Sequence, residues 1–178
     1  MARYARLALL AALSLAACGG HDGLTANGQV NASDATGSLG QFQFATDTKL
    51  YGDASAPPTG VMAGHCTIVR GTGGTPDKLD FGVMRTGMPG DLGLMQVRVQ
   101  VDDVRPTSTH AIVTATFGST TSTGDTYAAV PGTSCPLTFD YEPQDKVASF
   151  TLGTCAITGP GGTRQLTGSM TYFECTVE

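Results

Sequence analysis

The segment Met95-Gln96-Val97-Arg98-Val99-Gln100-Val101 is the clearest fold signal in this chain. Apolar and polar side chains alternate in it at every position. A strand with this two-residue period buries one face and exposes the other, as in antiparallel sheets. The segment therefore predicts a half-buried β-strand with its methionine and valines directed inward and its glutamines and Arg98 directed outward.

Further short runs of this kind lie on both sides of that segment. No later window has a convincing helical period, and the 24 glycines and many threonines disfavour helix. Together the runs predict an all-β domain of about eight or nine short strands, with an antiparallel β-sandwich preferred and a β-barrel as the alternative. The expected strands lie around Phe42 and Phe44 and in residues 61–70, 79–83, 95–101, 111–117, 137–142, 147–157 and 165–177.

Turn residues separate these runs, and two of the runs change parity. In residues 147–157 the apolar set passes from Phe150 and Leu152 to Cys155, which predicts a β-bulge at Gly153-Thr154. A similar shift after Tyr172 predicts an irregularity in the last strand. Glycine or proline marks the expected turns at residues 73–77, 88–91, 142–145 and 159–162.

Four cysteines follow Cys18, and an even number indicates two disulfides where the domain is exported, which the N-terminal segment described below predicts. The turn at 142–145 would bring Cys135 close to Cys155 and leave Cys66 to pair with Cys175. This is the preferred pairing among three possible ones. A zinc site is disfavoured because the chain has no C-x-x-C pair.

Residues 19–38 read GGHDGLTANGQVNASDATGS, which is rich in glycine and small polar residues. Such composition is typical of a flexible linker. We therefore expect three parts: residues 1–17, a linker over 18–38, and a single β-domain over 39–178.

The N-terminus has the form of a secretory signal peptide. Two arginines, Arg3 and Arg6, precede an apolar run from Leu7 to Ala17, which is too short to cross a bilayer. The run ends in Leu15-Ala16-Ala17-Cys18, which resembles the lipobox of bacterial lipoproteins. That resemblance implies attachment of a diacylglycerol to the sulfur of Cys18, followed by cleavage just ahead of Cys18. In many Gram-negative cells it further implies a third acyl chain on the new amino terminus.

The same resemblance indicates a location and a partner. Acyl chains on Cys18 would hold the protein to a lipid bilayer. Gly19 follows, where an Asp tends to retain enterobacterial lipoproteins at the inner membrane, so we expect the outer membrane, on its periplasmic or surface side. The formal net charge of −5, or −7 without the two leader arginines, disfavours nucleic acid as a partner.

The sequence contains few features of known catalytic sites. There is no G-x-S-x-G, P-loop or dinucleotide-binding motif, and we expect no cofactor and no metal. The groups considered are His21, His65 and His110, the carboxylates Asp140 and Glu142 as a glycosidase pair, and Asp102, Asp103 and Asp125 as calcium ligands. Each is more simply explained as a strand or surface residue.

The sequence therefore favours a membrane-anchored, disulfide-stabilised β-domain with a non-enzymatic structural or interaction role in the cell envelope. The alternative is a carrier domain that binds a small ligand or a glycan. An enzyme with an unfamiliar site would need His65 or His110 close to two carboxylates.

Overall fold

A computed structural model describes residues 23–52, 62–85, 93–104, 109–118 and 124–178. These residues form an all-β structure and contain no helix, so none is available there to cross a membrane. The described strands are β1 (Thr25–Asp34), β2 (Gly37–Lys49), β3 (Met62–Val69), β4 (Asp77–Arg85), β5 (Leu94–Val104), β6 (Thr109–Phe117), β7 (Asp125–Ala129), β8 (Leu137–Glu142), β9 (Val147–Gly159), β10 (Gly162–Phe173) and β11 (Thr176–Val177).

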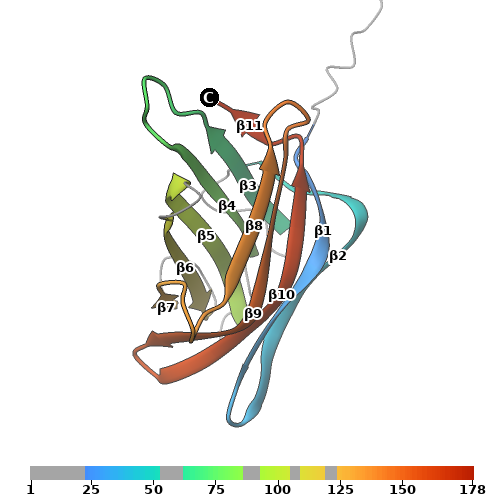
Figure 1. Cartoon of the computed structure of the whole chain (residues 1–178). Coiled ribbons are helices and arrows are strands. Elements are labelled where there is room, and N and C mark those ends of the chain that lie inside the picture. The colour runs from blue at the N-terminus through green and yellow to red at the C-terminus, as the bar shows by residue number, and fades with distance from the viewer. Residues whose placement is uncertain (1–22, 53–61, 86–92, 105–108, 119–123) are drawn as a thin grey trace, which may run out of the picture.

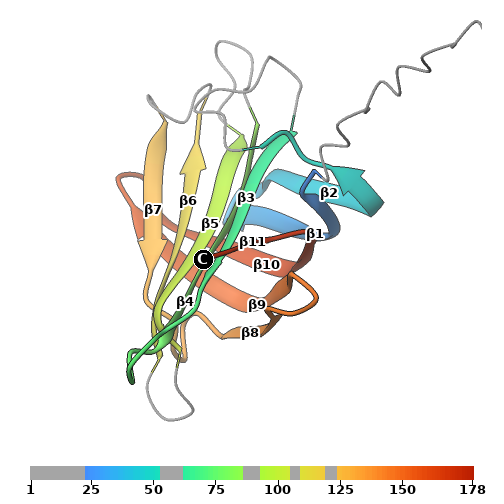
Figure 2. The same cartoon turned by 90° about the horizontal axis from the view of Figure 1, so that it is seen from above.

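The strands belong to one mostly antiparallel sheet with the order β11-β3-β4-β5-β6-β7-β9-β10-β1-β2, and β8 pairs with β9. This sheet is not closed. It bends so that two groups of strands face each other (Figures 1 and 2). We call β3 to β7 the first layer and β8, β9, β10, β1 and β2 the second layer. The layers join where Ala128 of β7 pairs with Thr158 of β9.

The core lies between the two layers and is built by the predicted alternation. Val97, Val99 and Val101 of β5 are buried, whereas Gln96, Arg98 and Gln100 between them are only half-buried. At the centre, the ring of Phe81 in the first layer stacks on Phe150 (5.5 Å between centroids) and on Tyr172 (6.0 Å) in the second. Aromatic rings that stack across the interface supply much of the apolar area that such a core needs.

The predicted bulge in β9 is present. Leu166 of β10 pairs with Cys155, and Gly168 pairs with Leu152, so Gly153 and Thr154 lie opposite the single residue Thr167. The bulge changes the parity of β9, which lets Leu152 and Cys155 both face the core. Of the predicted turns, residues 88–91 lie outside the described part of the chain.

The linker prediction is wrong for residues 25–38. These residues form β1 and the start of β2, and β1 pairs with both β2 and β10. Ala26, Val30 and Ala32 are buried, and they alternate with outward amides and hydroxyls. Because the inward residues are small and the outward ones polar, the composition imitates a linker although the two-residue period is that of a strand.

The irregularity predicted after Tyr172 in the last strand is not a bulge. β10 ends at Phe173, and Glu174 adopts a left-handed backbone conformation (φ 61°). The chain then crosses to the first layer, where β11 pairs in parallel with β3. Together with β1 and the short β7, this strand brings the count within the described residues to eleven, above the predicted eight or nine.

Candidate functional site

The main charged cluster of the described residues lies on the outward face of the first layer, across β3, β4 and β5. Nε2 of His65 lies 2.9 Å from Oδ1 of Asp80, and Nε of Arg98 donates to the same oxygen at 2.8 Å. Nη2 of Arg98 donates to Oδ2 of Asp80 in a short contact. One carboxylate thus binds a histidine and a guanidinium fork together.

The sheet register creates this cluster. His65 of β3 and Arg98 of β5 both lie directly opposite Gly82 of β4, two residues along the strand from Asp80. A Cβ at position 82 would lie 2.8 Å from Cε1 of His65, so the glycine leaves the space that the imidazole ring occupies. His65 was a candidate from the sequence, whereas Asp80, Arg98 and the role of Gly82 were not. The pattern of a single strand does not reveal the register between strands that brings these residues together.

The electrostatics of the cluster are those of a satisfied ion pair. Partial burial alone would raise the pKa of Asp80, but hydrogen bonds from Arg98 and His65 outweigh it and hold that pKa well below its usual value. The carboxylate therefore stays ionised, with both of its oxygens engaged. A general base needs an atom that is free to reach a substrate proton, and this arrangement offers Asp80 in a structural role instead.

The other predicted site residues are not brought together. His110 is exposed and pairs with Asp103 at one end of β6, whereas Asp125 pairs with Phe117 at the other end. Asp125 is thus separated from the adjacent pair Asp102 and Asp103 by the length of β6. No group of metal-binding side chains occurs in the described part of the chain.

The two candidate glycosidase carboxylates are exposed on β8 and serve local contacts. Oδ1 of Asp140 accepts a hydrogen bond from the backbone N–H of Tyr141, and Oε1 of Glu142 accepts one from Gln144. Cys18 and His21 lie outside the described residues.

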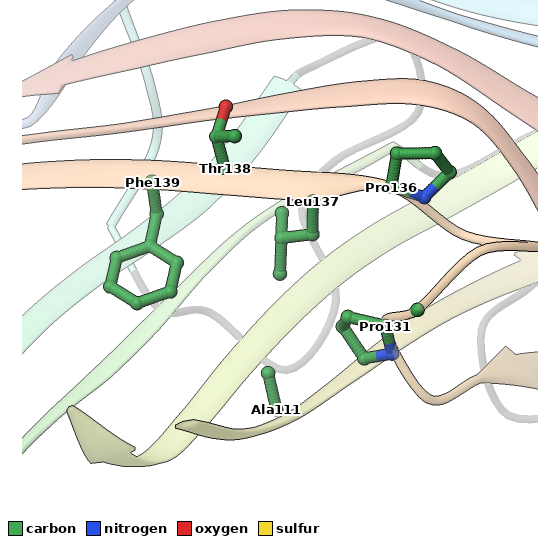
Figure 3. Close-up of a pocket in the computed structure, with 7 residues that line it drawn as sticks. Ala111, Pro131, Pro136, Leu137, Thr138 and Phe139 are labelled. Carbon is green, nitrogen blue, oxygen red and sulfur yellow. The ribbon is translucent and has the colours of Figure 1, made fainter. Parts of the chain in front are cut away.

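A pocket of about 360 Å³ lies between β6, β8 and the loop that joins β7 to β8. Figure 3 shows Leu137 and Phe139 pointing from β8 toward Ala111 of β6, whereas Thr138 points away. Pro131, Gly132 and Pro136 complete a largely apolar lining. The pocket is open, and it is where the small-ligand alternative would apply.

A hydrogen bond between side chains links β8 to β4. The hydroxyl of Tyr141 on β8 donates to Oδ2 of Asp77 on β4 at 2.9 Å, and Oδ1 of Asp77 accepts the N–H of Gly71 at 2.7 Å. Burial and the neighbouring carboxylate raise the pKa of Tyr141 to about 12, so the phenol keeps its proton and remains a donor. The contact ties the second layer to the first.

The outward face of the second layer differs from that of the first. Its central positions carry amides and hydroxyls, and we call this set the neutral face: Gln41 and Gln43 of β2, Asn27, Gln29 and Asn31 of β1, Gln165, Thr167, Ser169 and Thr171 of β10, and Ser149 and Thr151 of β9. Every member is half-buried or exposed, and none is ionisable.

The neutral face was missed at the sequence level for the same reason as β1. Its members are spread over four strands, and each strand shows only an ordinary polar alternation. The signal lies in the pairing: Gln43, Gln29, Ser169 and Thr151 form one continuous row, since each lies directly opposite the next, and Thr138 of β8 extends it.

Both disulfides are present among the described residues. Cys66 of β3 is bonded to Cys175, which follows β10, and Cys135 is bonded to Cys155 of β9. These are the pairs that the sequence favoured. All four cysteines are buried, with exposed fractions of 4% or less.

Comparison with protein-family models, with curated protein sequences and with solved structures found no match.

Proposed function

We propose that this protein is an exported lipoprotein of the bacterial envelope, anchored in the bilayer through acylated Cys18, and that its β-domain serves binding or structure and not catalysis. The observation that carries the proposal is the pair of buried disulfides. Disulfides form and persist in oxidising compartments such as the bacterial periplasm. They agree with the lipobox-like sequence Leu15-Ala16-Ala17-Cys18, which calls for export.

The non-enzymatic part of the proposal is supported by the charged cluster. Asp80 is fully engaged by Arg98 and His65, and the carboxylates of Asp125, Asp140 and Glu142 are exposed on other strands. An active site would instead bring a nucleophile or base and a stabilising donor to one cleft.

The fold also limits the height of the domain above the membrane. β1 begins at Thr25, seven residues after Cys18, so the intervening chain reaches at most about 25 Å. A lipid on Cys18 would therefore hold the domain close to the bilayer surface, and not on the long linker that composition predicted. Such a position suits a protein that binds a component of the envelope.

The test is substitution of the acylated residue. Cys18→Ala, produced in a bacterial host with the lipoprotein pathway, should move the protein from the membrane fraction to the soluble fraction or leave its leader uncleaved. Intact mass of the natural protein should show loss of residues 1–17 and added acyl chains. An unmodified Cys18 in the natural protein, or a Cys18→Ala variant that has lost residues 1–17 and still remains in the membrane fraction, would contradict the proposal.

A further inference from the structure

We propose that the neutral face of β9, β10, β1 and β2 binds a neutral polysaccharide. This inference rests on the proposed binding role in the envelope and names the class of partner. It starts from the distribution of charge. Globular domains contain about 25% charged residues on average, but the neutral face has none over four adjacent strands. A carboxylate, Asp140 of β8, lies opposite Ser149 at its edge.

The chemistry of the face selects the partner. A nucleic acid or an anionic lipid needs lysines or arginines, and a polycation needs carboxylates. A second copy of this chain would bury an interface core enriched in aromatic and apolar residues, which amides and hydroxyls do not supply. Amides and hydroxyls both donate and accept hydrogen bonds, and so do the hydroxyl groups of a neutral sugar polymer.

The amides at the centre of the face are held in place before any ligand arrives. Nε2 of Gln29 donates to Oδ1 of Asn31 at 2.7 Å and to Oε1 of Gln41 at 3.2 Å. Nε2 of Gln41 donates in turn to Oε1 of Gln43 at 3.1 Å. Long amide side chains lose rotamer freedom on binding, and those already fixed by neighbours lose less. The chain of amides therefore lowers the entropic cost of binding a ligand.

The extent of the face fits a polymer better than a single sugar. The row Gln43, Gln29, Ser169, Thr151 and Thr138 crosses five strands. With adjacent strands about 4.8 Å apart, the row is about 19 Å long and can contact several consecutive sugar units. Figures 1 and 2 show β9, β10, β1 and β2 side by side along it.

The experiment uses the mature lipidated protein in detergent and measures its retention on immobilised or insoluble polysaccharides. The neutral probes are amylose, dextran, mannan and cellulose, and the charged probes are alginate and chitosan. At least one neutral probe should retain the protein, and both charged probes should not. Gln29→Ala/Gln41→Ala/Gln43→Ala and the charged variant Gln43→Lys should each weaken retention at least tenfold.

Matched controls separate binding from folding. Gln96→Ala and Gln100→Ala change outward glutamines of the first layer and should leave retention unchanged. The thermal midpoints of all variants, measured together, should agree within a few degrees, since outward substitutions of this kind change stability little.

Several results would overturn the inference. These are the absence of retention on every neutral probe, equal retention by the neutral-face variants, and self-association of the protein that Gln43→Lys abolishes. Failure of the anchoring proposal is a separate result. A protein that is unmodified at Cys18 but still binds a neutral polysaccharide would refute the anchor and preserve the binding face.

Discussion

The two layers enclose one core, yet their outward faces have opposite chemistry. The first layer carries the ion pair of Asp80 with Arg98 and His65, which half-buries charge across three strands. The second layer carries the neutral face, in which Gln29 donates hydrogen bonds to Asn31 and Gln41. Both layers present similarly apolar inner faces, so folding alone does not explain the difference. The difference therefore arises at outward positions, which the packing of the core does not constrain.

The difference also separates two means of holding neighbouring strands. Ion pairs respond to pH and salt, whereas bonds between amides do not. The ion pair of the first layer should therefore be sensitive to solution conditions, and the bonds between the amides of the neutral face should be insensitive. Substitutions in the two layers can test this contrast, beginning with the bond that joins them.

The largest expected effect is the loss of Cys66–Cys175, which links β3 of the first layer to the residues after β10 of the second. Its cysteines are 109 residues apart, against 20 for Cys135–Cys155. The chain-entropy model gives about 5 and about 3 kcal/mol for loops of these lengths. In urea denaturation, Cys66→Ser/Cys175→Ser should therefore lose more free energy of unfolding than Cys135→Ser/Cys155→Ser. Equal losses, or the reverse order, would show that the Cys66–Cys175 disulfide between the layers is not the main covalent restraint.

The strand pattern was predictable wherever large apolar residues alternate with polar ones. β5, β6, β8 and β9 follow from Val, Phe and Leu at every second position, and the bulge at Gly153-Thr154 follows from a change of parity in the same pattern. β1 was not predictable in this way, because Ala26 and Ala32 bury so little area that their alternation is weak. Its strand character is evident only in the structure, where β1 pairs with β2 on one side and with β10 on the other.

The outward sites were less predictable than the strands. His65 was recognisable as a strand histidine, but its partner Asp80 lies on the next strand and Arg98 on the one after. Their meeting depends on the register around Gly82, and a single sequence does not fix the register of three strands. The disulfide pairing was more predictable, because the hairpin of β8 and β9 places Cys135 near Cys155 and leaves Cys66 and Cys175 as the remaining pair.

Gly82→Ala should give the next largest effect and would sharpen the contrast between the layers. A Cβ there would lie 2.8 Å from Cε1 of His65 and 2.9 Å from the backbone oxygen of Val97, which cannot move freely. Crowding of this kind costs about 1–3 kcal/mol. The matched control is Gly153→Ala in β9, where the nearest atom is a side-chain carbon of Pro136 at 3.2 Å. If both variants lose the same free energy of unfolding in urea, Gly82 has no special role in seating His65.

The smallest effect tests the pH sensitivity of the first layer. Asp80→Asn removes the negative charge that Arg98 and His65 both contact. A hydrogen bond to a charged group contributes about 1.5–3 kcal/mol, but solvent screens this half-buried cluster. We therefore expect the variant to lose about 1 kcal/mol of unfolding free energy at pH 7. The pKa of Asp80 is lowered in the folded state. Its contribution is therefore complete above the unfolded value of about 4 and is lost as the pH falls through the lower folded value.

The difference in unfolding free energy between the natural protein and Asp80→Asn should thus be constant from pH 7 to about 4 and shrink below that. Gln43→Ala in the second layer is the control, because neither form carries a titrating group at that position, and its difference should not change over the same range. A gap for Asp80→Asn that stays level down to pH 2 would mean that the ion pair contributes nothing through its charge. The two outward faces would then differ in composition but not in the forces that hold their strands.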